Sequence, residues 1–121
     1  RRVLFRSTAS GRRYSDIIEA AKIQIENTYM AENISLNTVA ASVGMSPSYF
    51  SSVFSREVGK TFVEYLTETR MEKAKELLMC SPLKTSEIGY EVGYKDPHYF
   101  SYIFKKTQGC SPKDYRARRK E

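Results

Sequence analysis

The chain contains an internal repeat, and this repeat constrains the fold more strongly than any other feature of the sequence. Two stretches match at a spacing of about fifty residues, with one insertion, in the turn between Gly93 and Pro97. The matched residues are mostly apolar residues, glycines and prolines, which are the types that form cores and turns. The pairs are Val39 with Ile88, Val43 with Val92, Gly44 with Gly93, Pro47 with Pro97, Tyr49 with Tyr99, Phe50 with Phe100, Ser51 with Ser101, Phe54 with Phe104, Gly59 with Gly109, and Tyr65 with Tyr115.

Each copy has the pattern of a short helix, a tight turn and a second helix. In the first copy, a helix with one apolar face ends at Gly44, which suits a C-terminal cap. Ser46 can cap the next helix, and Pro47 occupies the first helical position, which proline favours. The second copy repeats this order, with Asp96 as the cap and Pro97 after it. This is the spacing of a helix-turn-helix unit.

The rest of the chain is also predicted to be helical. A cap at Ser15 and an apolar stripe predict a helix to Met30, and the run from Thr61 to Cys80, which lacks Gly and Pro, predicts a long one. A last helix starts at Ser111 and continues to about Arg119. Since no stretch requires a strand, we predict an all-α fold of about seven helices, with tandem helix-turn-helix units joined by a long connecting helix. The predicted domains are a basic linker (1–14), a first unit (15–60), the connecting helix (61–80), and a second unit with a basic C-terminal tail (81–121).

The net charge of +6 does not by itself indicate nucleic-acid binding, because the positive charge is concentrated at the two ends. Residues 1–14 and 113–121 together carry a net charge of +8, whereas residues 15–112 hold ten basic and twelve acidic residues. A surface that binds a polyanion must therefore come from the arrangement of side chains.

The sequence argues against several classes of protein. Cys80 and Cys110 lack the spacing of a zinc site or a disulfide framework, so we expect two small, half-buried apolar side chains. With one histidine, His98, and no phosphate-binding glycine loop, we predict no enzyme, no metal and no cofactor. No apolar run approaches the ~18 residues of a membrane span, so no membrane partner is predicted. The first residues lack an initiator Met, and we expect the chain to be cut from a longer protein.

Helix-turn-helix units place their second helix in the major groove of double-stranded DNA, where its exposed side chains meet base edges. We predict that Phe50, Val53 and Phe54, with Phe100, Ile103 and Phe104, belong to the core. The candidates for base contacts are Ser48, Ser51 and Ser52 in the first copy, and Pro97, His98, Ser101 and Tyr102 in the second. The candidates for phosphate contacts are Ser46, Arg56, Lys60, Arg70, Lys95, Lys105 and Lys106.

Two of these assignments have alternatives. Arg70 lies near the apolar side of the connecting helix, so it is either an interhelical anchor or a phosphate contact. Tyr49 and Tyr99 adjoin phenylalanines and are interpreted as packing at the edge of the core, with stacking on DNA as the alternative.

The length of the connecting helix suggests how two units could act together. Twenty helical residues span about 30 Å, which is close to the ~34 Å between successive major grooves on one side of B-DNA. We therefore predict a bipartite site, and a non-palindromic one because the two copies differ at their exposed positions.

From Ile17 to Arg116, the chain resembles the DNA-binding domain of AraC-family transcriptional regulators. The resemblance rests on VAASVGMSPSYFSSVF, on YLTETRMEKAKELL, and above all on EIGYEVGYKDPHYFSYIFKKTQGCSPKDYR. It implies seven helices with two helix-turn-helix units, in a bacterial, cytoplasmic and nucleoid-associated regulator. It also implies a sensor or receiver domain on the N-terminal side of this one.

The chain departs from the family pattern at two positions. Members often carry Arg where this sequence has Ser52 and Tyr102, and Arg suits guanine and phosphate contacts best. We therefore expect a larger share of phosphate contacts, thymine-methyl packing and recognition of DNA shape. The alternative is that one unit is a protein-interaction module, for example with RNA polymerase, and that only the other contacts bases.

Overall fold

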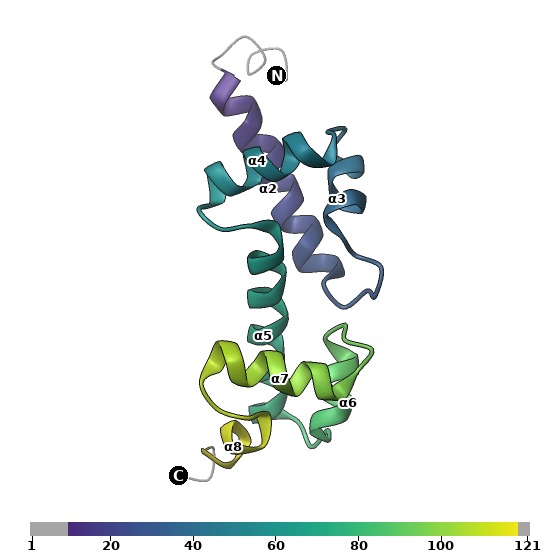
Figure 1. Cartoon of the computed structure of the whole chain (residues 1–121), viewed down its shortest axis with the longest axis vertical. Coiled ribbons are helices and arrows are strands. Elements are labelled where there is room, and N and C mark those ends of the chain that lie inside the picture. Colours follow the sequence, from purple (N-terminus) through teal and green to yellow (C-terminus); the bar gives the residue numbers. More distant parts are fainter. Residues whose placement is uncertain (1–9, 119–121) are drawn as a thin grey trace. The chain divides into compact units, whose positions relative to one another are not determined.

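The computed structural model describes residues 10–118. Within this range the chain forms seven helices and no strand, which confirms the predicted all-α fold of tandem helix-turn-helix units (Figure 1). The helices are α2 (Ser10–Thr28), α3 (Leu36–Ser42), α4 (Pro47–Val58), α5 (Phe62–Cys80), α6 (Thr85–Glu91), α7 (Pro97–Gln108) and α8 (Pro112–Ala117).

The helix ends follow from local sequence. The side chains of Ser46, Asp96 and Ser111 each accept a hydrogen bond from a backbone N–H in the first turn of the helix that follows, and proline comes next in each case. α4 and α7 both end at a glycine with positive φ, 84° at Gly59 and 86° at Gly109. Residues with a side chain rarely adopt this backbone conformation, which favours glycine at both helix ends.

Helices α2 and α8 differ from the prediction at their ends, and α2 stops at Thr28 instead of Met30. α2 begins at Ser10 instead of Ser15, so residues 10–14, predicted to be linker, form the first turns of the helix. A tertiary contact stabilises this extension, because the Tyr14 ring packs edge-on against Tyr49 with 6.1 Å between the ring centroids. α8 ends at Ala117, two residues before the predicted end, and Arg119 lies outside the described residues.

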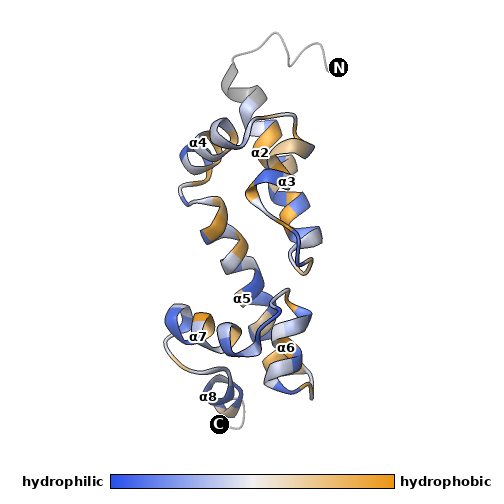
Figure 2. Ribbon diagram, turned by 45° about the vertical axis from the view of Figure 1, so that its right-hand side comes forward, coloured by the Kyte–Doolittle hydropathy of each residue, from blue (hydrophilic) through white to orange (hydrophobic). Residues whose placement is uncertain are grey.

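The chain folds into two compact units. Unit 1 contains the described residues up to Thr28 and Asn33–Leu66, and unit 2 contains Tyr29–Glu32 and the described residues from Thr67. Apolar and polar residues alternate along the helices of both units, as expected for helices buried on one side (Figure 2). The core of unit 1 contains Ile18, Ala21, Ile25, Val39, Ala40, Phe50, Val53, Phe54, Phe62 and Leu66, and that of unit 2 contains Met71, Ala74, Leu78, Ile88, Val92, Phe100 and Phe104.

The structural repeat extends to the helix that precedes each helix-turn-helix. The buried residues Ile18, Ala21 and Ile25 of α2 have the same spacing as Met71, Ala74 and Leu78 of α5. Hydroxyl groups bond the last turn of both helices in the same way. Thr28 Oγ1 donates to the carbonyl of Gln24, and Ser81 Oγ donates to that of Leu77, both at 2.7 Å.

Helix α5 therefore belongs to both copies. Its start ends the first copy, as α8 ends the second, and the rest of it opens the second copy as α2 opens the first. Between the matched helices, the first copy holds four additional residues, Tyr29–Glu32, and these pack with unit 2.

Candidate nucleic-acid interface

Helix α4 of unit 1 has a buried face and an exposed face. Phe50, Val53 and Phe54 are completely buried, as predicted. Ser48 and Ser52 are exposed and Ser51 is half-buried, so the three serines predicted to contact bases lie away from the core. The Tyr49 N–H donates to the Ser46 side chain at 3.3 Å, which fixes the start of the helix.

Helix α7 of unit 2 repeats this arrangement with larger side chains. Phe100 and Phe104 are completely buried, whereas Ile103, predicted to be core, is half-buried. His98 is exposed, 57% of Tyr102 is exposed, and both Pro97 and Ser101 are partly exposed. The backbone N–H of His98 donates to Asp96 Oδ1 at 2.9 Å, so its imidazole is not used in the cap.

Most of the basic residues predicted to contact phosphate lie at the surface. Arg56, Lys95, Lys105 and Lys106 are exposed and Lys60 is half-buried. Lys106 Nζ lies 5.8 Å from the centroid of the Tyr102 ring. Arg56 pairs with the adjacent Glu57 at 3.8 Å, and Lys95 pairs with Glu32 at 3.5 Å; such surface pairs are weak and a phosphate could replace the carboxylate.

Arg70 does not fit the phosphate role predicted for it. Only 8% of its surface is exposed. Its Nε donates to the Tyr29 carbonyl at 2.8 Å and one Nη to that of Ala31 at 3.2 Å. Its guanidinium also lies 4.8 Å from the centroid of the Tyr94 ring. Arg70 therefore fits the other predicted role, a structural anchor, because two of its nitrogens donate to backbone carbonyls inside unit 2.

Tyr94 precedes α7 and was not singled out by the sequence. Its ring packs against both Phe100 and Tyr99, with centroids 5.9 and 5.7 Å away. Burial raises the pKa of the Tyr94 hydroxyl above its ordinary value, and the Arg70 guanidinium opposes this shift. The turn before α7 is thus held by an aromatic ring and a cation.

Tyr49 and Tyr99 are more exposed than packing at the core edge predicts, at 46% and 49%. Each contacts another tyrosine: Tyr49 packs against Tyr14, and Tyr99 against Tyr94 and Tyr102. The phenylalanines adjacent to Tyr49 and Tyr99 in the chain do not by themselves indicate these tyrosine contacts.

Comparison with known proteins decides the family. A family model described as a helix-turn-helix domain matches residues 39–118, which run from within α3 to the residue after α8. The chain is 35% identical to the arabinose operon regulatory protein of Escherichia coli over 85 residues, 70% of this chain. The C-terminal domain of AraT, a response regulator from Geobacillus stearothermophilus, matches with 41% identity and a TM-score of 0.83 over 85% of both chains. The chain belongs to the AraC-type helix-turn-helix family.

This AraC-type domain is thus a DNA-binding domain of the type found in transcription regulators. It matches the DNA-binding domain of AdpA, solved in complex with a target DNA, with 25% identity and a TM-score of 0.72, covering 86% of this chain and 89% of that one. The AraC-type domain spans 58% of the length of one curated relative and 29% of the arabinose operon regulatory protein.

A second arginine of the AraC-type domain also has a role that the sequence did not reveal. Arg116 belongs to the predicted basic C-terminal tail, but its guanidinium donates to the carbonyls that end α5 and lead to α6. The acceptors are Leu78 (3.0 Å), Leu83 (2.6 Å), Ser81 (3.0 Å) and Leu77 (3.5 Å). Arg116 therefore caps a helix C-terminus, where a cation is favoured. Arg119 and Lys120, the rest of the predicted tail, lie outside the described residues.

Other features of the AraC-type domain concern metals and membranes. Cys80 is exposed rather than half-buried, and Cys110 is intermediate. Among the described residues there is no group of three His, Cys, Asp or Glu side chains that could hold a metal ion. Within the same part of the chain, no helix is both long and apolar enough to span a membrane.

Proposed function

We propose that the domain binds a bipartite site on double-stranded DNA, with α4 in one major groove and α7 in the next. The observation that carries this proposal is the shared construction of α4 and α7. Each has two fully buried phenylalanines on one side and exposed hydroxyl, imidazole or phenol groups on the other. Side chains on the exposed face of such a helix can donate to and accept from base edges.

The two helices differ in what they offer to DNA. In α7, His98 and Tyr102 present large polar groups, and Lys105 and Lys106 provide cations in the last turn. In α4, the corresponding exposed positions are serines, and the last turn has Arg56 beside Glu57. We infer that α7 makes the more specific contacts and the stronger phosphate contacts, and that α4 depends more on DNA shape.

We propose that the length of α5 sets the spacing between the two half-sites. Its 19 residues correspond to about 28 Å of helix, near the ~34 Å between successive major grooves. In this proposal, α5 acts as a spacer of about one turn of DNA, and a single chain contacts both half-sites.

The full-length protein is proposed to be a cytoplasmic bacterial regulator that associates with the nucleoid. A sensor or receiver domain would precede this domain and control it. RNA polymerase is a further proposed partner, through whichever unit contributes least to DNA binding.

The test compares variants of the two units on the same DNA. A preferred site is first selected from random duplexes, and affinities are then measured at fixed salt for Ser51→Ala, Ser52→Ala, His98→Ala and Tyr102→Ala. Loss of a specific base contact should weaken binding by about 1–3 kcal/mol and relax selectivity at one position. Tyr90→Ala is the matched control for Tyr102, because Tyr90 is 56% exposed on α6, outside the proposed base-contacting face.

Two results would change the proposal. If the variants of one unit leave affinity and footprint unchanged while those of the other lose binding, that unit does not contact bases, and its role as a protein-interaction module is favoured. If all four variants behave like Tyr90→Ala, neither helix contacts bases in the proposed way.

A further inference from the structure

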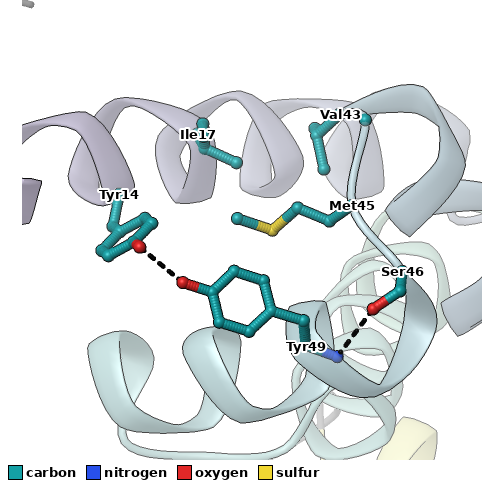
Figure 3. A pocket seen from close by; sticks show the side chains of 7 residues that line it. Tyr14, Ile17, Val43, Met45, Ser46 and Tyr49 are labelled. Atoms are coloured by element: carbon teal, nitrogen blue, oxygen red, sulfur yellow. Dashed lines mark hydrogen bonds between the residues drawn. The ribbon is translucent and has the colours of Figure 1, made fainter.

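Unit 1 contains a pocket at the start of α4 (Figure 3). Its volume is about 310 Å³, and it is a half-open hollow bordered by the first half of α2, the turn between α3 and α4, and the first turn of α4. The side chains around it are Tyr14, Ile17, Val43, Met45, Ser46 and Tyr49. None of the lining residues is charged, and the hydroxyl groups of Tyr14 and Tyr49 are hydrogen-bonded to each other at one side.

The internal repeat identifies the equivalent place in unit 2. The matched core residues of α2 and α5 place Tyr14 opposite Thr67 in the alignment of the two copies, and Ile17 opposite Arg70. In the turn, Gly44 matches Gly93 and Met45 matches Tyr94. The two sites therefore have the same backbone framework and different side chains.

In unit 2 this place is filled. The Arg70 guanidinium lies over the Tyr94 ring at 4.8 Å, and the Tyr94 ring packs on Tyr99. A Cβ added to Gly93 would meet Arg70 Nη2 and the carbonyl oxygen of Tyr29, both at 2.8 Å. The Tyr94 ring, the Arg70 guanidinium and the Tyr29 carbonyl thus occupy this site together.

In unit 1 the same place is open. Ile17 stands where unit 2 has Arg70, and Met45 stands where it has Tyr94, so unit 1 has neither a cation nor a ring at these two positions. The Tyr14 ring, which packs on Tyr49 from α2, lies at one side of the pocket instead. A Cβ added to Gly44 would meet nothing within 4 Å. The pocket is therefore the space that the Arg70 and Tyr94 side chains and the Tyr29 carbonyl fill in the other copy.

We propose that this pocket binds a small, uncharged, planar aromatic molecule that carries a hydroxyl group. Such a ligand would supply a ring at the position matched to Tyr94, where unit 1 has Met45. The Met45 thioether and the Tyr49 ring favour aromatic contacts. The hydroxyls of Tyr14, Tyr49 and Ser46 can donate to or accept from the ligand hydroxyl. The volume is at the lower end of the range of about 300–1,000 Å³ for ligand pockets, which limits the ligand to one or two rings.

The experiment uses p-cresol, which is the tyrosine side chain as a free molecule, and the 121-residue chain labelled with 15N. Amide shifts are followed during the titration, in the absence of DNA, so the result does not depend on the proposed DNA interface. We expect saturable shifts at Gly44, Met45 and Tyr49, with a dissociation constant of about 1 mM or lower for so small a ligand. 4-Methylcyclohexanol, which keeps the hydroxyl but is not planar or aromatic, should bind several-fold more weakly.

Two variants fill the pocket with groups that unit 2 already uses. Ile17→Arg combined with Met45→Tyr rebuilds the cation and the ring, and Met45→Phe supplies a ring alone. Circular dichroism and thermal unfolding show which of the two variants are folded. If the double variant does not fold, the p-cresol affinity of Met45→Phe provides the test. A folded variant should bind p-cresol at least tenfold more weakly than the parent chain.

Three outcomes would overturn the proposal. They are shifts that do not saturate, shifts that lie mainly at Gly93, Tyr94 and Tyr99 of unit 2, and an affinity that is unchanged in a folded, filled variant.

Discussion

The guanidinium of Arg70 lies 4.8 Å from the centroid of the Tyr94 ring, while its Nε donates to the carbonyl of Tyr29 at 2.8 Å. One buried side chain on α5 thus holds both the turn before α7 and the segment after α2. Its exposed fraction is 8%, and its hydrogen bonds to the Tyr29 and Ala31 carbonyls are partly buried, which strengthens them relative to bonds in water.

Removing the Arg70 guanidinium should destabilise unit 2. Arg70→Ala leaves the carbonyls of Tyr29 and Ala31 without this donor, and we expect a loss of about 2–4 kcal/mol in the free energy of unfolding. The measurement is urea unfolding, with Arg56→Ala as the control because Arg56 is exposed; its effect should stay within about 0.5 kcal/mol. Equal effects of the two variants would show that the buried contacts of Arg70 do not contribute to stability.

Arg116 should matter much more than its neighbour Arg118. Arg116→Ala removes a guanidinium that bonds to the carbonyls of Leu77, Leu78, Ser81 and Leu83, and we expect a loss of about 2–3 kcal/mol. Arg118→Ala removes an exposed residue whose guanidinium lies 6.0 Å from the Tyr115 ring, so about 0.5 kcal/mol or less is expected. Urea denaturation of both variants provides the comparison, and a stable Arg116→Ala protein would contradict the capping role.

Gly89 is required by the close approach of α6 to α7. A Cβ at this position would lie 3.0 Å from Phe100 Cδ2 and 3.1 Å from Phe100 Cβ, and the Phe100 ring is fully buried. Overpacking costs about 1–3 kcal/mol, whereas alanine gains up to about 1 kcal/mol in helix propensity, so Gly89→Ala should be destabilising on balance. Asn37→Ala, at an exposed position of α3, should show the propensity gain alone. Thermal melts that rise for both variants would disprove the packing constraint.

The two lysines at the end of α7 should account for part of the salt dependence of DNA binding. If Lys105 and Lys106 each neutralise one phosphate, the double alanine variant should reduce the slope of log K against log salt by about 2. The control removes the same charge from α5, through Lys73→Ala and Lys75→Ala, and should leave the slope unchanged. Fluorescence anisotropy over a range of KCl concentrations measures both slopes, and equal changes would show that only net charge matters.

The spacer role of α5 can be tested by changing its stiffness. Glu68→Gly with Glu72→Gly alters two exposed positions, and Glu68→Ala with Glu72→Ala removes the same side chains but preserves the helix. The glycine variant should bind the bipartite site more weakly than the alanine variant, while each half-site alone is bound equally by the two. Equal affinity for the bipartite site would mean that a stiff helix between the units is not needed.

The sequence predicts well those features that local chemistry determines. Caps at Ser46, Asp96 and Ser111 depend on one side chain and the next few backbone groups, so they can be found without a tertiary structure. The buried phenylalanines follow from helical periodicity in the same way.

The features that the sequence leaves open or does not indicate depend on contacts between residues far apart in the chain. For Arg70 the anchor and phosphate roles both stay open, because nothing near it in the sequence indicates that it bonds the Tyr29 and Ala31 carbonyls. For Arg116, nothing nearby in the sequence indicates its bonds to the end of α5. The sequence does not indicate the match between α2 and α5 either. The buried residues of the two helices, Ile18, Ala21 and Ile25 in α2 and Met71, Ala74 and Leu78 in α5, share only their spacing and apolar character. For the base and phosphate candidates, exposure is compatible with contact, but their roles stay predictions.

The placement of the segment Tyr29–Glu32 in unit 2 limits how the chain can be cut into folded fragments. It precedes α3 and α4 of unit 1 in the sequence, yet it packs with unit 2, so unit 2 is discontinuous along the chain. No single cut yields two complete units. A fragment that starts at Thr67 would keep Arg70 but lose the carbonyls it bonds. During synthesis, likewise, this segment leaves the ribosome before the rest of its unit, which can be completed only after unit 1 has been made.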